Sequence, residues 1–245
     1  MTEIVFVGTS DAFGGGGRRQ SAILVRAQAG TVLLDCGMTT SAGLHALGIA
    51  RDEIDAILVS HFHGDHFGGI PPLLLACLYA DRRHKPLVVA GPPGVEARVR
   101  GAAEALGFSL AGRDWSFALE FQELWAGKVE PVGPVLASTF ETHHQREVCP
   151  HGIVVRADDR RVVFSGDTGW FDALPRHVGA ADLFICECTN VEPIFEYHLS
   201  LEELAARRDD FDCARIVATH LGAEMAKQRG ACELETADDG MVIRL

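Results

Sequence analysis

The chain has 245 residues, of which 47% are hydrophobic and 23% charged, an ordinary globular composition with enough material for a sizeable core. Its net charge of −12, from 22 basic and 34 acidic residues, disfavours a general nucleic-acid-binding face, because phosphate backbones require clustered Lys and Arg. No apolar run approaches the roughly 20 residues of a membrane span, and the seven cysteines are odd in number and scattered, so we expect a cytoplasmic protein with no membrane partner.

The chain begins with a predicted strand, Ile4–Val7, and then a glycine-rich loop, Gly14–Gly17, which is followed by Arg18 and Arg19. The strand starts without a basic or apolar leader, which favours a protein that is not exported. A Walker-type phosphate loop is disfavoured, because no Gly-Lys-Ser/Thr follows and no helix is predicted there. A mobile basic loop that receives an anionic substrate stays open as an interpretation.

The densest group of ligand-type side chains follows Ile54–Val59, which has the length and β-branching of a buried strand. In the motif SHFHGDH, three histidines and one aspartate lie within six residues: His61, His63, Asp65 and His66. Alternate residues of an extended turn point the same way, so His61 and His63 can bind one ion. The other two lie past the bend and can reach a second. Imidazole nitrogen with carboxylate oxygen suits zinc, manganese or iron rather than calcium or magnesium.

The segments that flank this motif have the hydrophobic periodicity of ordinary helices and strands, and they contain no second dense cluster of ligand-type residues. The predicted helices are Ser41–Leu47, Leu73–Tyr79 and Val95–Leu106, and the predicted strands include Leu87–Ala90 and the alternating segment Phe117–Phe121. We expect the basic segment Arg82–Lys85 to be solvated surface. Trp115 and Trp125 are interpreted as packing residues rather than a substrate platform.

Three strand ends in the C-terminal half also carry ligand-type residues. Leu136–Phe140 leads into His143 and His144, a hairpin that ends at Phe164 leads into Asp167, and Arg215–Thr219 ends at His220. Another predicted strand, Asp182–Cys188, contains Glu187, and its cysteines are interpreted as small packing residues. His198 precedes a helix with the capping box Ser200–Glu203.

Functional residues of α/β proteins gather at strand ends, because the loops there can vary while the sheet fixes the positions at which they begin. Together these residues predict two adjacent coordination shells. The first contains His61, His63 and one of His143 and His144, and the second contains Asp65, His66 and His220. Asp167 bridges them, since a carboxylate has two oxygens. Two cations about 3.5–4 Å apart acidify a shared water and hold both oxygens of an in-line displacement.

The motifs SHFHGDH, SGDTG and ATHLG resemble those of the metallo-β-lactamase superfamily, over essentially the whole chain. The resemblance implies an α/β fold, a four-layer αβ/βα sandwich, in a single domain of residues 1–245 with pseudo-symmetric halves of about 1–125 and 126–245. It also implies two divalent transition-metal ions between the sheets, Zn2+ in the first place and Mn2+ as the alternative. It favours His144 over His143, because the family's third His usually lies where the strand becomes a loop.

Particular residues indicate which branch of the superfamily the chain resembles. Members that reduce oxygen at di-iron sites have Glu where this chain has His63, and true β-lactamases have Cys where it has Asp167. The stretches VGTSDAFGGGGRRQSAILV, ICECT and HLSLEELAA resemble the ribonuclease Z branch and its small phosphodiesterase relatives. In that branch an acid and a His form a proton-transfer pair near the leaving group, and the matching residues here are Glu187 and His198.

The resemblance implies a metal-dependent phosphodiesterase in which a metal-bridging hydroxide attacks phosphorus and His198 protonates the leaving oxygen. Asp65, His198 and Glu187 are the expected catalytic residues. Members that process tRNA have a long Gly/Pro-rich arm between the third His and the bridging Asp, whereas only 22 residues separate His144 from Asp167. We therefore expect a small anionic substrate, a small or cyclic phosphodiester, and disfavour tRNA.

Two alternatives stay open, a thioester or lactone hydrolase on the same dinuclear site and a non-catalytic metal-binding sensor. Glu187 and His198 favour the phosphodiesterase, because a sensor needs no proton donor and a thiolate leaving group needs little protonation. The sequence does not decide the exact substrate, the metal in the cell or the oligomeric state, and a homodimer stays open.

Overall fold

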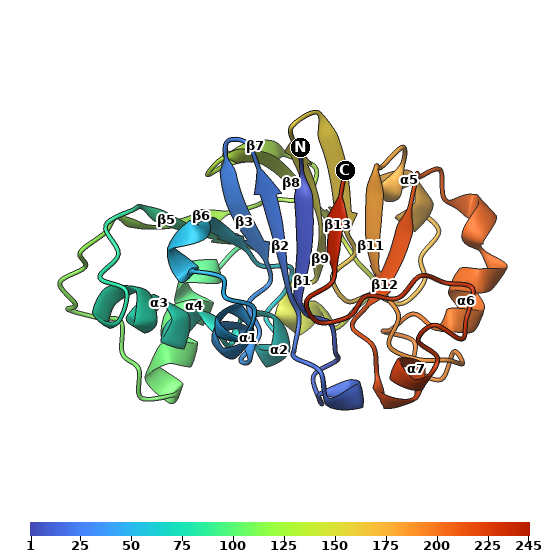
Figure 1. Ribbon diagram of the computed structural model, residues 1–245, viewed down its shortest axis with the longest axis horizontal. Helices are drawn as coiled ribbons and strands as arrows, with labels where there is room; N and C mark the ends of the chain where they lie inside the picture. Colours follow the sequence, from blue (N-terminus) through green and yellow to red (C-terminus); the bar gives the residue numbers. More distant parts are fainter.

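The computed structural model describes residues 1–245 and contains two β-sheets packed face to face (Figure 1). In spatial order the first sheet contains β13 (Val242–Arg244), β1 (Glu3–Gly8), β2 (Ala22–Ala27), β3 (Gly30–Leu34), β4 (Ile54–Leu58), β5 (Leu87–Gly91) and β6 (Leu119–Glu123). The second sheet contains β12 (Ile216–Thr219), β11 (Leu183–Glu187), β10 (Arg160–Phe164), β9 (His151–Ala157), β8 (Val135–Glu141) and β7 (Val129–Val132).

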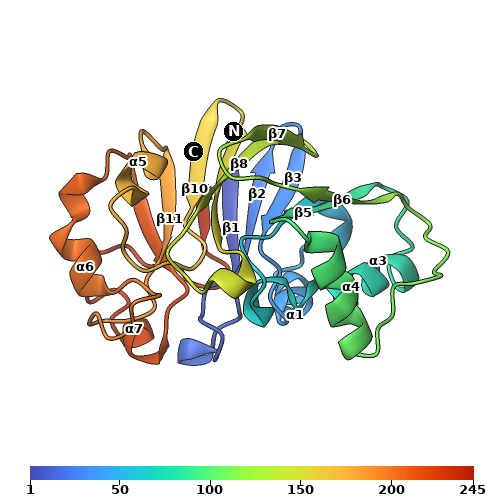
Figure 2. The ribbon, with the colours of Figure 1, turned by 180° about the vertical axis from the view of Figure 1, so that it is seen from behind.

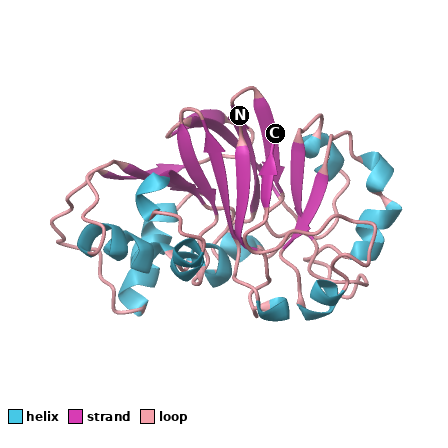
Figure 3. Cartoon of the chain, viewed as in Figure 1, coloured by secondary structure: helices cyan, strands magenta, loops and turns pink.

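Helices cover the outer face of each sheet, as the views from both sides show (Figures 2 and 3). The first sheet is flanked by α1 (Thr40–Ala46), α2 (Gly64–Phe67), α3 (Ile70–Tyr79) and α4 (Val95–Ala105), and the second by α5 (Leu174–Val178), α6 (Leu201–Ala206) and α7 (Ala223–Lys227). No helix of the chain is both long and apolar enough to cross a membrane. The predicted fold class, a four-layer αβ/βα sandwich, is confirmed. The division into two halves stays a prediction, and β13 returns to the first sheet.

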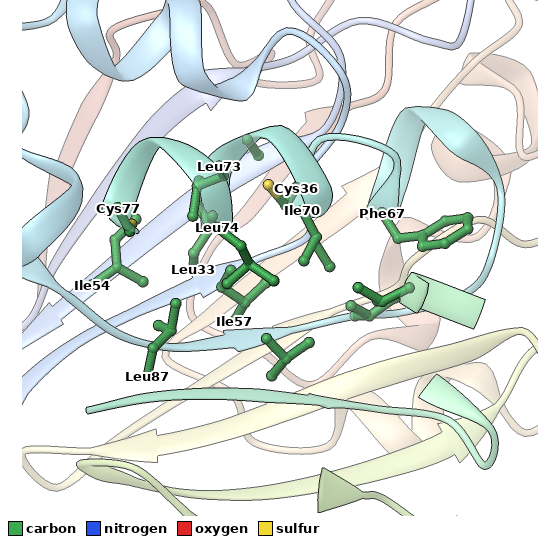
Figure 4. Close-up of a cluster of buried hydrophobic side chains, with 14 of the residues drawn as sticks. Leu33, Cys36, Ile54, Ile57, Phe67, Ile70, Leu73, Leu74, Cys77 and Leu87 are labelled. Atoms are coloured by element: carbon green, nitrogen blue, oxygen red, sulfur yellow. The ribbon is translucent and has the colours of Figure 1, made fainter. Parts of the chain in front are cut away.

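Side-chain alternation along the strands builds three hydrophobic cores between the four layers. In β1, Ile4 and Phe6 belong to the core between the sheets, whereas Val5 and Val7 belong to the core under the helices of the first sheet. Figure 4 shows part of this second core. Full burial of a side chain such as Phe6 contributes about 1.5–3 kcal/mol. These cores hold the strand ends that carry the ligand-type residues.

Arg82 and His84 of the basic segment Arg82–Lys85 are exposed, as the sequence predicts, but Arg83 is not. Arg83 is only 2% exposed. Its guanidinium donates hydrogen bonds to the carbonyl oxygens of Ile54 and Pro86, both at 2.7 Å, and of Lys85 at 2.6 Å. A guanidinium has five N–H donors, so one Arg can satisfy several loop carbonyls at once. Arg83 therefore joins the starts of β4 and β5.

The glycine-rich loop is also more fixed than a mobile basic loop would be. Gly15–Gly17 forms a 3-10 turn. Arg18 Nε lies 2.7 Å from Asp238 Oδ1, and Arg19 Nε donates to the carbonyl oxygen of Val7 at 2.6 Å. The basic pair is therefore already occupied by partners within the chain.

The interpretation of Cys186, in β11, and of Cys188, directly after it, is confirmed, because both are fully buried in the core beneath α5–α7. Trp115 also packs, against the core under α3 and α4. The prediction for Trp125 is wrong, since this residue is 52% exposed. It lies in the turn between β6 and β7, where the sequence offers no periodicity to show which way a side chain points.

Candidate metal centre

The strand ends that carry the predicted ligands meet in space. In the second sheet, β10, β11 and β12 are parallel. Strand β8 runs in the same direction, because β9 is antiparallel to both β8 and β10. Their carboxyl ends therefore lie along one edge of the sandwich. The turn after β4 reaches the same edge, where His61 Nε2 lies 3.6 Å from Asp167 Oδ2.

One group of donor atoms comprises His61, His63, His144 and Asp167, all within 4.8 Å of one another. His63 Nδ1 lies 3.1 Å from His61 Nε2 and 3.2 Å from His144 Nε2. Three imidazole nitrogens and a carboxylate oxygen at this spacing can hold a tetrahedral ion. The set equals the predicted first shell with His144 as the third His. His143 is not part of it, and its backbone instead pairs with Gly169.

A second group comprises Asp65, His66, Asp167 and His220. His66 Nε2 lies 3.2 Å from Asp167 Oδ1 and 3.3 Å from His220 Nε2. His220 Nε2 lies 3.2 Å from Asp65 Oδ2. Asp167 thus belongs to both groups, which is the position that a bridging carboxylate requires.

The residues of both groups fit divalent ions on chemical grounds. Asp167 Oδ1 is buried and accepts no well-oriented hydrogen bond. His66 Nε2 lies 3.2 Å away, but the angles of a hydrogen bond are not met. A buried carboxylate oxygen without a partner is costly. Imidazole nitrogens also face one another at 3.1–3.3 Å across both groups. A cation in each group would satisfy these lone pairs and the free oxygen together.

The second ring nitrogen of each histidine is occupied by an outer partner. Where the partner is a carbonyl or carboxylate oxygen, which only accepts hydrogen bonds, it fixes which nitrogen carries the proton, whereas the hydroxyls of Ser60 and Thr189 can donate or accept. The pairs are His66 Nδ1 to Asp35 Oδ2 at 2.6 Å, His144 Nδ1 to Tyr197 O at 3.0 Å, His63 Nε2 to Gln145 Oε1 at 3.2 Å, His61 Nδ1 with Ser60 Oγ at 3.0 Å, and His220 Nδ1 with Thr189 Oγ1 at 2.9 Å. The opposite nitrogen of every ring is therefore presented to the cluster.

Asp35 is the main residue that the sequence analysis missed. It is fully buried at the end of β3, and its Oδ1 accepts a hydrogen bond from Ser60 N at 2.8 Å. Its φ of 58° is in the left-handed region, as is that of His220 at 56°. Such strained residues gather at functional sites. The sequence did contain a signal for Asp35. It is an acidic residue directly after a predicted buried strand, which is also the position of the predicted ligands.

Burial and nearby charges act in opposite directions on the cluster. Burial lowers the pKa of His61 well below its usual value and lowers the pKa of His144 to about 4, which keeps both rings neutral, as metal ligands must be. Burial alone would raise the pKa of Asp65 and Asp167, but His66 and His220, whose own pKa these carboxylates raise in spite of burial, lower the pKa of both well below the usual range. Both carboxylates are therefore ionised at neutral pH.

Beside the second group lies an imidazole–carboxylate pair. His198 Nδ1 donates to Glu187 Oε1 at 2.8 Å. Glu187 is fully buried and also accepts hydrogen bonds from Thr168 N at 3.0 Å and Thr189 N at 3.1 Å. Burial would lower the pKa of His198, but the Glu187 carboxylate raises it to about 9. The ring of His198 stacks on that of His220, with centroids 5.5 Å apart.

A cleft of about 890 Å³ opens over the second group and His198. Asp65, Asp167 and His220 lie in its wall, and the exposed side chains of Phe13 and Phe195 lie there too. The cleft is large enough for a substrate well beyond a phosphate group. No Lys or Arg lines it.

Comparisons with known proteins agree over nearly the whole chain. The sequence profile of the family described as Anti-Pycsar protein Apyc1 matches residues 2–238. The ribonuclease Z of Mycobacterium bovis (strain BCG / Pasteur 1173P2) is 27% identical over 240 residues, which cover 90% of this chain and 86% of that protein. The structure of the metallo-beta-lactamase fold protein YhfI from Bacillus subtilis is similar, with 19% identity and a TM-score of 0.79 over 100% of both chains. Human tRNase Z, short form, has 23% identity and a TM-score of 0.79 over 99% of this chain and 98% of that chain.

These comparisons overturn one expectation, that tRNA is a disfavoured substrate. A relative matching nine tenths of the chain is named ribonuclease Z, and a structural neighbour is named tRNase Z. The prediction rested on a short connection before Asp167 and on the net charge of −12. Net charge is a property of the whole surface, and it does not report the charge of the particular cleft that a substrate enters.

Proposed function

The chain belongs to the family described as Anti-Pycsar protein Apyc1, in the ribonuclease Z-like branch of the metallo-β-lactamase superfamily, and from this premise we propose that it is a dinuclear metal-dependent phosphodiesterase acting on a small or cyclic phosphodiester. The observation that carries the proposal is the position of Asp167 in two donor groups, next to the Glu187–His198 pair. A shared carboxylate suits a pair of ions, and the imidazole suits a leaving group that needs a proton.

Each of the two ions would be bound by residues that follow strands of both sheets. His61, His63 and His144 with one oxygen of Asp167 would hold one ion, and Asp65, His66 and His220 with the other oxygen would hold the second. Nitrogen and carboxylate donors favour Zn2+, with Mn2+ as the alternative. When bound, such a pair of cations lowers the pKa of a water and stabilises negative charge on phosphate oxygens.

His198 is the proposed proton donor. Glu187 accepts the hydrogen bond from Nδ1, and the raised pKa of about 9 means that Nε2 also carries a proton at neutral pH. That proton passes to the departing alkoxide, and the ionised Glu187 orients the ring and stabilises its positive charge before transfer. The two backbone N–H groups that bind Glu187 keep its carboxylate in place.

Phe13 and Phe195 support a substrate that carries an apolar or planar group beyond the phosphate. Phe13 is 94% exposed in the wall of the cleft, and the ring of Phe195 lies 5.7 Å from that of His198. Exposed aromatic rings at this position can cover a flat substituent of a diester bound at the cluster. A nucleotide-derived phosphodiester has such a substituent.

A second candidate is cleavage of a phosphodiester within RNA, because the curated relatives are named ribonuclease Z. The same donor groups and the same proton donor would serve that reaction. A thioester or lactone hydrolase is less favoured, since a thiolate or carboxylate leaving group gains little from His198.

The proposal is tested with purified protein loaded with Zn2+ or Mn2+ and a panel of substrates: a nitrophenyl phosphodiester, cyclic nucleotides, a precursor tRNA, a thioester and a lactone. We expect turnover of phosphodiesters and none of the thioester or lactone. Asp167→Ala serves as the inactive control and the exposed Asp172→Ala as the matched active one. Thioester or lactone turnover without phosphodiester turnover would contradict the proposal.

A further inference from the structure

A second cleft, of about 730 Å³, borders the metal-ligand cluster at His144. It is lined by the turn between β6 and β7, by the end of β8 and by the segment that follows it. His144 belongs both to this cleft and to the first donor group. The second cleft is therefore adjacent to the first donor group.

The charge of this second cleft differs from that of the first. Lys128 and Arg146 line it, and both are exposed with no ion pair and no side-chain hydrogen bond. Basic residues elsewhere are mostly paired, as Arg51 is with Asp81. Glu141 is the single acid of the second cleft, whereas five acids line the first: Asp11, Asp65, Asp167, Glu192 and Glu224. An additional anionic group on a substrate is therefore favoured in the second cleft.

Trp125 adds a flat surface beside these cations. It lines the second cleft and is 52% exposed. Its turn is held to the sheet, because Gly127 N donates to the carbonyl oxygen of Thr139 at 2.8 Å and Lys128 N to that of Trp125 at 3.1 Å. An exposed aromatic ring that lines the same cleft as two cations is an arrangement that can bind a base and its phosphate.

We propose that the second cleft binds a nucleotide unit that carries its own phosphate, adjacent to the scissile diester. The phosphate lies between Lys128 and Arg146, and the base stacks on Trp125. The leaving group then occupies the first cleft, beside His198. This inference rests on the proposed phosphodiesterase function and adds to it a preferred substrate whose second phosphate and base lie in the second cleft.

The experiment measures binding apart from turnover. A 5′-phosphorylated dinucleotide with a noncleavable phosphonate linkage is titrated into the metal-loaded protein, and the Trp emission and Kd are recorded at several salt concentrations. Inorganic triphosphate is the probe without a base. We expect the dinucleotide to quench the emission and to bind more tightly than triphosphate.

Three variants separate the contributions of the two cations and of Trp125 to the binding of the dinucleotide. Lys128→Gln with Arg146→Gln should raise the dinucleotide Kd about tenfold or more and reduce the salt slope by about 0.7 for each lost phosphate contact. Trp125→Ala should abolish most of the quenching and raise the dinucleotide Kd at least about fivefold, with little effect on triphosphate. The matched control is Arg82→Gln with Arg208→Gln, which removes two exposed, unpaired cations outside both clefts. It should leave the Kd unchanged.

Equal dinucleotide Kd values for the wild type and the Lys128/Arg146 variant would overturn the inference, as would triphosphate binding as tight as that of the dinucleotide. Turnover of a nitrophenyl phosphodiester by the same wild-type preparation is measured in parallel. Absence of that turnover counts against the phosphodiesterase itself, whereas a Kd that ignores the cleft variants counts against the nucleotide subsite alone.

Discussion

Asp167 is the residue on which the geometry of the cluster depends. Its two oxygens face different groups of histidines, 3.2 Å from His66 Nε2 on one side and 3.6 Å from His61 Nε2 on the other. The histidines keep its pKa well below the usual range in spite of burial. A fully ionised, buried carboxylate with one free oxygen is stable in the folded protein only with compensating positive charge nearby.

Replacing His198 tests its role as a proton donor. His198→Ala should reduce kcat/KM about 10²–10⁴-fold on an alkyl phosphodiester and much less on a nitrophenyl phosphodiester, because the better leaving group departs without a proton. Glu187→Gln should show a milder version of the same contrast. The control is His84→Ala, at an exposed histidine outside both clefts.

Metal content is measured in each of these variants. It should match the wild type, because His198 belongs to neither of the two donor groups that share Asp167, although Glu187, His198 and His220 form a third group of donor atoms. Equal losses on both leaving groups, or a loss of metal that parallels the loss of activity, would mean that His198 is a ligand or a structural residue.

Asp35 offers a test of the outer hydrogen bonds. Asp35→Asn keeps the shape of the side chain but weakens acceptance of the 2.6 Å bond from His66 Nδ1. We expect metal affinity to fall about 10–100-fold, as is typical when an outer partner of a ligand is removed. A chelator competition series measures this, with the exposed Asp172→Asn as the control. Unchanged affinity would show that Asp35 has only a structural role.

At the scale of the elements, strand ends were the predictable part of the site. The dense motif after β4 and the polar residues after β8, β10 and β12 follow apolar runs whose type the sequence shows clearly. Trp125 and Arg83 were not predictable, because their segments have no periodicity and their environment is set by distant strands. Arg83 can be buried because its guanidinium donates hydrogen bonds to carbonyl oxygens at the start of β4 and directly before β5.

Arg83 should therefore stabilise the first sheet. Arg83→Met removes the donors of several carbonyl oxygens, of which that of Ile54 is buried, and each buried group left unsatisfied costs about 1–3 kcal/mol. We expect the free energy of unfolding to fall by about 3 kcal/mol in urea titrations. Arg82→Met, at the exposed neighbour, should change it by less than about 0.5 kcal/mol. Similar urea midpoints for the two variants would be inconsistent with a structural role for Arg83.

At the scale of the whole molecule, the cluster joins the two sheets, because its ligands come from both. His61 follows a strand of the first sheet, and His144, Asp167 and His220 follow strands of the second. The sequence predicted this convergence from the motifs. It did not predict the two clefts of unlike charge that border the cluster, because the residues that line each cleft are far apart in the chain.

Removal of metal should consequently destabilise the whole fold. An ion that binds only the folded state stabilises it by about 4.1 kcal/mol at a concentration of 1,000 times its Kd. We expect chelation to lower the melting temperature and readdition of Zn2+ to restore it. An unchanged melting temperature, with metal loss verified by elemental analysis, would mean that the ions do not link the sheets.

The central claim is a pair of ions that share Asp167, and counting bound metal tests it most directly. Elemental analysis of purified wild-type protein should give about two transition-metal ions per chain. Asp167→Ala should lower occupancy of both sites, because the lost carboxylate belongs to both donor groups. Stoichiometry that stays near two in Asp167→Ala, or a wild type that never exceeds one ion per chain, would contradict the claim.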